Sequence, residues 1–229
     1  MNSGSYLVMD RFPEFDAARE VLSEVSEADW VPTIPDGPYK TDGWRVVKIL
    51  AQGKPTAFAE KHPEIKRVID FFECPIVQVL FYSMLPGAEL HAHRDLDGTL
   101  ELGRLRFHVP IETNPDVNFM VSKKRVPMRS GELWALNTSY LHAVENKGQT
   151  DRVHLVVEVE ANEWCWSKLP KKTMKFYAHY AWFMMLVVGR AMRLVLTDPK
   201  AALSRLGMGQ FLARRLLRHR RAEDSSYRI

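Results

Sequence analysis

Two segments in the first third of the chain place hydrophobic residues at helical spacing. In residues 63–73, Pro63 occupies the first turn, where proline is tolerated. The stretch 31–43 between the two segments holds three prolines and two glycines and is predicted to be a loop. In residues 14–28, one helix face collects Phe15, Ala18, Val21, Leu22 and Val25.

The pattern then changes to short β segments between residues 76 and 159. Such strands, separated by turns at roughly 8–12-residue spacing, are typical of a barrel, sandwich or jelly roll. The predicted strands are 76–85, 105–111, 117–121, 131–136 and 152–159. The last strand alternates, so that one of its faces carries Arg152, His154, Val156 and Glu158.

The last third of the chain has a helical pattern. Residues 176–189 form an uncharged run of 14 residues, which is shorter than the about 20 residues that a membrane span needs. Extending the run would place Arg190 and Arg193 in lipid, at a high cost in free energy. We therefore expect a helix that packs on the β core or on a second copy. A further helix is predicted to begin at Asp198-Pro199.

Charge is distributed unevenly along the chain, whose net charge is +4. Residues 161–229 contain 14 Lys or Arg against 4 Asp or Glu, whereas residues 1–160 contain 18 against 24. We predict a β domain over 1–160, including the N-terminal helices, and a basic helical extension over 161–229. Residues 176–221 are a candidate for peripheral membrane or dimer contact, and the alternative is a solvated face that complements the acidic body. Because aromatic residues do not interleave with the arginines, no nucleic-acid partner is expected.

Composition narrows the class of protein further. A hydrophobic content of 46% and a charged content of 26% exclude a disordered chain. Cys74 and Cys165, the two cysteines, cannot form a disulfide framework, which favours a reducing compartment. The first residues lack a basic segment followed by an apolar one, so no secretory signal is expected. The expected location is cytoplasmic, with a membrane-peripheral position left open by the basic extension.

The segment HAHRDLDG, residues 91–98, carries the candidate chemistry. In an extended chain, residues two apart point to one side, so His93 can face a common point with either Asp95 or His91. His142, in SYLHAVEN, is the candidate third ligand. Two histidines and one carboxylate leave one side of an Fe(II) ion open for a bidentate co-substrate and O2.

Arg152 lies ten residues after His142, at the start of an apolar strand. A buried arginine in a barrel wall is costly unless an anion meets it. A dicarboxylate that chelates iron at one end would present its far carboxylate to such an arginine in bidentate fashion. The alternative for Arg152 is an exposed charge at a strand end.

Five motifs follow one another in this β region. They are HRD (93–95), RLRFHVPIETNP (104–115), GELWALN (131–137), LHAVEN (141–146) and RVHLVVEV (152–159). In order and spacing they resemble the aspartyl/asparaginyl β-hydroxylase family of Fe(II)/2-oxoglutarate-dependent dioxygenases. The resemblance runs from about residue 76 to residue 160. It implies a mainly β fold with flanking helices, built on a double-stranded β-helix (jelly roll, cupin-like) core and followed here by the C-terminal helical extension.

The resemblance also implies roles for particular residues. His93 and His142 match the two iron-binding histidines, and Arg152 matches the arginine that holds the distal carboxylate of 2-oxoglutarate. Arg106 and His108 match a strand whose side chains also reach this co-substrate. The first-named family members lack the acidic ligand, so Asp95 is similar to the His-x-Asp branch that includes the cis-proline hydroxylases. Asp95 would also occupy the halide position of a halogenase, which disfavours that activity.

The implied reaction is hydroxylation of an unactivated C–H bond with Fe(II), 2-oxoglutarate and O2, the 2-oxoglutarate being decarboxylated to succinate. The implied substrate is an amino-acid-like small molecule, free, carrier-bound or within a peptide. His91 is expected to line the pocket or to support the ligands, with a surface position as the alternative, and Trp134 to lie in the core rather than to form a substrate platform. We expect Asn114, Asn137 and Thr138 at the substrate mouth.

Three alternatives remain. A zinc metalloenzyme would use His91, His93 and His142, but it has no need of the dicarboxylate-binding Arg106, His108 and Arg152. A binding module without turnover is disfavoured by the intact ligand set. A lipid or membrane-proximal substrate is kept open by the basic extension and by related hydroxylases that act on lipid A.

Overall fold

The computed structural model describes residues 6–33, 42–96 and 98–199. The chain divides into two units, one made of residues 1–100 and 104–171 and the other of residues 101–103 and 172–229. The boundary that the sequence predicts at residue 160 stays a prediction.

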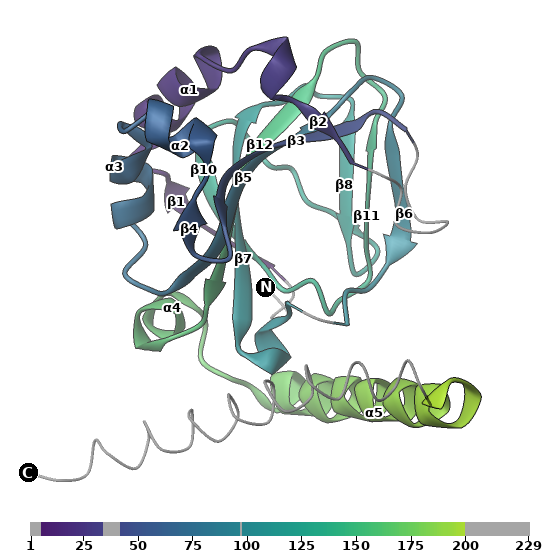
Figure 1. Ribbon diagram of the computed structural model, residues 1–229. Coiled ribbons are helices and arrows are strands. Elements are labelled where there is room, and N and C mark those ends of the chain that lie inside the picture. The colour runs from purple at the N-terminus through teal and green to yellow at the C-terminus, as the bar shows by residue number, and fades with distance from the viewer. Residues whose placement is uncertain (1–5, 34–41, 97, 200–229) are drawn as a thin grey trace, which may run out of the picture. The chain divides into compact units, whose positions relative to one another are not determined.

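Two antiparallel sheets make up the first unit. Its strands are β1 (Tyr6–Arg11), β2 (Val31–Pro32), β3 (Trp44–Ala51), β4 (Lys54–Pro55), β5 (Ile76–Met84), β6 (Glu89–His93), β7 (Arg104–Glu112), β8 (Val117–Val121), β9 (Lys124–Arg125), β10 (Glu132–Leu136), β11 (His142–Asn146) and β12 (Arg152–Glu160). The larger sheet has the order β1-β10-β7-β12-β5-β3-β2, with β4 paired to β3, and the smaller has the order β6-β11-β8-β9. Figure 1 shows the smaller sheet facing one side of the larger one.

Short helices cover the other side of the larger sheet. They are α1 (Phe15–Ser23), α2 (Ala57–Lys61) and α3 (Ile65–Asp70), with α4 (Glu163–Lys168) after β12. Among the described residues, 3₁₀ helices span Glu27–Asp29 and Leu100–Leu102. The apolar face predicted for residues 14–28 is the one that α1 buries, through Phe15, Ala18, Val21 and Leu22. Helix α1 contacts β7 and α2 contacts β3, so these helices form a third layer.

The predicted fold class is confirmed: the first unit is mainly β, with two facing sheets of the jelly-roll type and flanking helices. The five predicted strands correspond to β5, β7, β8, β10 and β12. Trp134 is buried in the same cluster as Trp44 and Met84, as expected of a core residue. The structure adds β3, which pairs with β5 along most of its length.

Strand β12 is the centre of the larger sheet, because it pairs with β5 on one side and with β7 on the other. All of its residues except Glu160 are buried. Its polar residues therefore lie in the interior together with its valines, and this is what places charge inside the fold.

Helix α5 (Met174–Thr197) belongs to the second unit. It begins after Thr173, whose side chain accepts a hydrogen bond from the Phe176 amide, and it is longer than the predicted run 176–189. Phe183 is the one buried residue of this helix, and its packing on the β core or on a second copy stays a prediction. The helix predicted after Asp198-Pro199 lies almost wholly outside the described residues.

Candidate metal and co-substrate site

A cavity of about 530 Å³ opens between the two sheets. The larger sheet contributes Arg106, His108 and Arg152 to its lining, and the smaller sheet contributes His93 and His142. Its volume is in the range of small-molecule sites, which run from roughly 300 to 1,000 Å³. Five of the six predicted site residues thus reach one cavity from strands, and Asp95, just beyond β6, completes the set.

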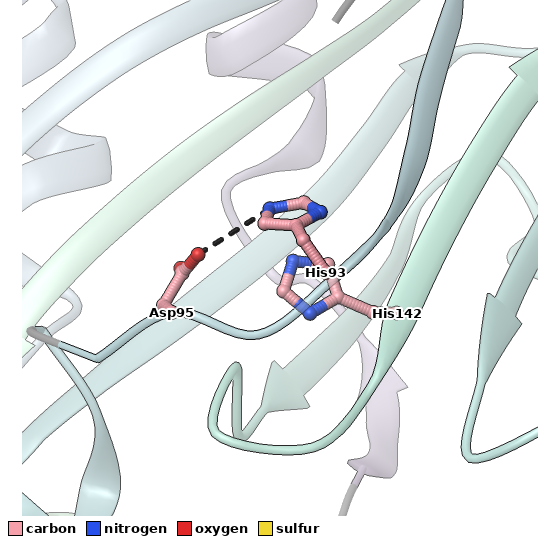
Figure 2. Close-up of side chains that lie close together, drawn as sticks. All are labelled: His93, Asp95 and His142. Carbon is pink, nitrogen blue, oxygen red and sulfur yellow. Dashed lines mark ion pairs between the residues drawn. The ribbon is translucent and has the colours of Figure 1, made fainter. Parts of the chain in front are cut away.

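His93, Asp95 and His142 form a compact group of metal-ligand type, shown in Figure 2. Their ligand atoms all lie within 4.8 Å of one another. His93 and His142 are direct partners across β6 and β11, and their ring centroids are 4.3 Å apart. The Asp95 Oδ1 atom lies 3.4 Å from His93 Nε2. The structure therefore brings together the three ligands that the sequence predicts.

Backbone carbonyl groups fix the orientation of both rings. His93 Nδ1 lies 2.8 Å from the carbonyl oxygen of His91, and His142 Nδ1 lies 2.9 Å from that of Tyr140. A carbonyl oxygen only accepts hydrogen bonds, so each Nδ1 donates and carries the proton. In the neutral rings, Nε2 is then the unprotonated atom, free to bind a metal ion.

Asp95 is held in its ionised form. Its amide donates to the Thr138 carbonyl at 3.0 Å, and Arg106 Nη1 donates to its Oδ2 at 3.0 Å. Burial by itself raises the pKa of Asp95, but the hydrogen bond with His93 and the charge of Arg106 together hold that pKa well below its usual value. Burial lowers the pKa of His142 to about 4, so this ring is neutral. Burial by itself lowers the pKa of His93, but the hydrogen bonds to Asp95 and to the His91 carbonyl, together with the charge of Asp95, raise that pKa above its usual value.

A neutral His142 and an ionised Asp95 are the protonation states that metal ligation requires, and a bound cation would displace the proton that Asp95 favours on His93. Two imidazoles and one carboxylate on one side of a metal ion are the set typical of Fe(II) sites with open positions. The residues present therefore fit the metal ion that the sequence implies.

Arg106 connects the ligand group to a buried glutamate. Its Nη2 atom lies 3.5 Å from Glu158 Oε2, while Arg104 and Gln78 donate to the Glu158 carboxylate at 2.8 and 3.0 Å. Arg106 was expected to reach the co-substrate, and it lines the cavity, but its terminal nitrogens are engaged by Asp95 and Glu158. Its role toward the co-substrate stays a prediction.

Arg152 is 2% exposed, which excludes a solvated strand-end charge. Its Nη2 donates to His154 Nδ1 at 2.9 Å, and its Nε has no hydrogen-bond partner among the described residues. Burial lowers the pKa of Arg152 to about 9, and no carboxylate of the described chain raises it again. Burying a cation without a counter-ion costs roughly several kcal/mol of desolvation free energy. An anion such as a carboxylate would remove this deficit.

Two buried histidines adjoin this arginine. His154 Nδ1 lies 3.4 Å from His108 Nδ1, and His108 Nε2 has no partner. Burial, together with the charge of Arg152, lowers the pKa of both rings well below the usual value, so both are neutral. Each unsatisfied buried polar atom costs about 1–3 kcal/mol, so this end of the cavity is built to receive a polar group.

The prediction for the His91 side chain is wrong. That side chain is 51% exposed beside Glu89 and does not line the cavity. The pairing of β11 with β6 shifts register between His142 and Val144, and such a bulge interrupts the alternation of side chains. The metal-ligand group of the described residues contains Asp95 in place of His91, so the three-histidine zinc set is not assembled.

Asn137 and Thr138 line the cavity, as expected of mouth residues. Asn114 instead lines a second cavity of about 350 Å³ and donates to Asn146 and Thr150. Sequence reasoning missed the contribution of Glu158, although the alternation in β12 places it on the same face as Arg152. The signal available in the sequence was a carboxylate on the same strand face as an arginine that was predicted to be buried.

A model of the aspartyl/asparaginyl beta-hydroxylase family matches residues 14–162, more than half of the chain. A sequence search of curated proteins gives no match.

Solved structures with a similar fold include a 2OG-Fe(II) oxygenase family oxidoreductase from Burkholderia pseudomallei, with 14% identity, a TM-score of 0.45, and coverage of 66% of this chain and 82% of that one. A prolyl-4-hydroxylase from Pseudomonas putida has 13% identity and a TM-score of 0.47, and the match covers 69% of this chain and 93% of that one. HygX from Streptomyces hygroscopicus was solved with nickel and 2-oxoglutarate bound. It has 12% identity and a TM-score of 0.45, and the match covers 69% of this chain and 84% of that one. At these scores the structural similarities carry no functional argument, and the match over residues 14–162 is decisive.

Proposed function

The chain belongs to the aspartyl/asparaginyl β-hydroxylase family of Fe(II)/2-oxoglutarate-dependent dioxygenases, and we propose that it hydroxylates an unactivated C–H bond of an amino-acid-like substrate. The substrate is free, carrier-bound or part of a peptide. The observation that carries this proposal is the presence, in one cavity, of a His-Asp-His ligand group and a buried arginine without a counter-ion.

The chain's own residues divide the work of binding and orientation. His93, Asp95 and His142 would hold Fe(II), which when bound supplies the activation of O2 that is coupled to decarboxylation of 2-oxoglutarate to succinate. Arg152 binds the distal carboxylate of 2-oxoglutarate through its charge and its unpartnered Nε. Arg106, braced by Glu158, holds the carboxylate of Asp95 in place. The buried β12 wall keeps water away from the reacting groups.

The wall of the cavity formed by β3 and β5 supports a small polar substrate. It contributes Lys48 and Gln78 together with the rings of Trp44 and Tyr82. Lys48 makes no ion pair with any described residue. We assign it to the carboxylate of the substrate, with Gln78 as a partner for polar groups beside it. Lys48→Ala should then raise the KM for the substrate with less change in kcat.

The experiment that tests the reaction class is an anaerobic titration of the metal-free protein with Fe(II) and then 2-oxoglutarate. A weak visible band near 500–530 nm is the rough expectation for bidentate 2-oxoglutarate on such a site. Amino acids, carrier-bound amino acids and peptides would then be screened by succinate release. Absence of the band, with tight zinc binding that depends on His91, would overturn the proposal.

A second candidate is a lipid or membrane-proximal substrate, and the exposure of α5 favours it. We propose a cytoplasmic location at a membrane surface for this protein. Succinate release in the presence of lipid extracts, compared with amino-acid substrates, distinguishes the two substrate classes.

A further inference from the structure

Helix α5 exposes large apolar side chains along its whole length. Met174 and Leu196, near its two ends, are both 82% exposed, and Met185, in the middle, is 66% exposed. The other exposed large apolar residues of this helix are Tyr177, Trp182, Leu186, Val188, Met192 and Val195. By length and composition the helix could cross a membrane. The core helix of a soluble protein also meets this criterion, but such a helix is mostly buried, whereas α5 is mostly exposed.

The exposed residues form a stripe. Met185, Val188, Met192 and Val195 follow one another at steps of three and four residues, which keeps them on one face. At about 100° per residue, Phe183, the buried residue, falls on the opposite side of the helix. The stripe is therefore the face of α5 that the described residues leave exposed.

The charges on α5 decide how such a helix would meet a bilayer. Lys175 and Arg193 lie about a third of a turn from the centre of the stripe, and Arg190 lies nearly opposite to it. A spanning orientation would carry Arg190 and Arg193 into hydrocarbon, since the uncharged run 176–189 extends for only about 21 Å at 1.5 Å per residue. An in-plane orientation places the stripe in the acyl region and the cations at the headgroups.

Charge also selects the partner. Helix α5 contains no Asp or Glu, and residues 161–229 carry 14 basic against 4 acidic residues. A second copy would bring two basic helices together with no acidic side chain on either to pair with. An anionic membrane surface instead offers both the negative charge and the apolar phase.

We propose that α5 binds in the plane of an anionic membrane, with the stripe formed by Met185, Val188, Met192 and Val195 facing the acyl chains. This attachment is independent of the proposed reaction, so the two can fail separately.

The test is co-sedimentation of the full chain with vesicles of phosphatidylcholine, with and without phosphatidylglycerol. We expect binding that requires phosphatidylglycerol and weakens at high salt. Met185→Glu combined with Val188→Glu should weaken binding at least about tenfold. The double variant Arg190→Gln and Thr197→Glu, which makes the same change in net charge at exposed positions off the stripe, should weaken it no more than about threefold. A far-UV circular dichroism spectrum equal to that of the wild type shows that both variants are folded.

Three outcomes would overturn the proposal. One is the absence of binding to anionic vesicles. Another is equal loss of binding in the two double variants. The third is a concentration-dependent dimer, seen by sedimentation velocity without lipid, that the stripe variant abolishes, because the stripe is then an interface between copies. Extraction of the bound protein by alkaline carbonate supports the in-plane orientation, whereas resistance to extraction would contradict it.

Discussion

The interior of the β unit and the surface of α5 depart from the usual distribution of residues in opposite directions. Arg152, His154 and Glu158 are all at most 4% exposed on β12, whereas Met174 and Leu196 of α5 are 82% exposed. Charged residues are rarely buried without partners, and large contiguous apolar surfaces are rarely left in water. In the β unit, Glu158 is satisfied by Gln78 and two arginines, so Arg152 marks the place where a small anion completes the site.

The comparison separates two kinds of incompleteness. The cavity needs point charges at defined positions, which a metal ion and a dicarboxylate supply. Helix α5 needs an extended apolar phase with negative charge at its border. Variants in one region should therefore leave the property of the other unchanged.

The largest effect is expected from loss of a metal ligand. His142→Ala should lower succinate formation by more than about a thousandfold, because the ion contributes several kcal/mol of transition-state stabilisation. His91→Ala is the matched control, since the side chain of His91 points away from the cavity. Fe(II) titration and succinate release measure both, and equal losses would show that His91 is a ligand after all.

Arg152→Ala should raise the Kd for 2-oxoglutarate by roughly 30-fold to 1,000-fold, because a buried charge-assisted pair is lost. Arg152→Lys keeps the charge but lacks the planar guanidinium group, so its Kd for 2-oxoglutarate should lie between those of the wild type and Arg152→Ala. Anaerobic titration gives the Kd, with Arg125→Ala, in the second cavity, as the control. Membrane binding should not change in any of these variants.

Glu158→Gln should weaken Fe(II) binding by about 10-fold to 100-fold, the range known for residues that orient metal ligands. The reason is that Arg106 loses the brace that holds it against Asp95. Arg104→Gln removes a different partner of Glu158 and should change the affinity by less than about threefold. A metal affinity in Glu158→Gln equal to wild type would refute the bracing role.

The smallest effect concerns pH and stability of the metal-free protein. Burial lowers the pKa of His154 well below 6.5 in the folded state, so the unfolded chain takes up a proton first as pH falls. His154 therefore has no effect on the free energy of unfolding above about pH 6.5. Below that pH it lowers the free energy of unfolding, by up to about 1.4 kcal/mol per pH unit. Denaturant unfolding between pH 7 and 5 should show a shallower pH dependence in His154→Gln. An unchanged slope would mean that this ring is protonated in the folded state.

The sequence was sufficient for five strands and for the candidate ligand group because both depend on local pattern. The segment 117–121 was predicted to be a strand and forms β8. His93 and Asp95 were predicted to face a common point, and they lie in one group of metal-ligand type. Strand β3 was missed because most of its residues are buried on both faces, so it lacks the alternation that reveals a half-buried strand.

Other features depend on contacts between distant residues. The direction of His91 is set by the register between β6 and β11, and the pairing of Arg106 by Glu158, more than fifty residues away in the chain. The exposure of α5 could not be predicted either, because an apolar pattern shows that a helix avoids water but not what covers it.

The carbonyl groups that hold the two ligand rings have a consequence for sequence divergence. Every residue type supplies a carbonyl group, so the tautomers and directions of His93 and His142 do not depend on which side chains stand at 91 and 140. Homologues can therefore differ at these neighbouring positions and retain the same centre. The centre is vulnerable at the rings themselves, at Asp95, and to any insertion or deletion that alters the alignment of β6 with β11.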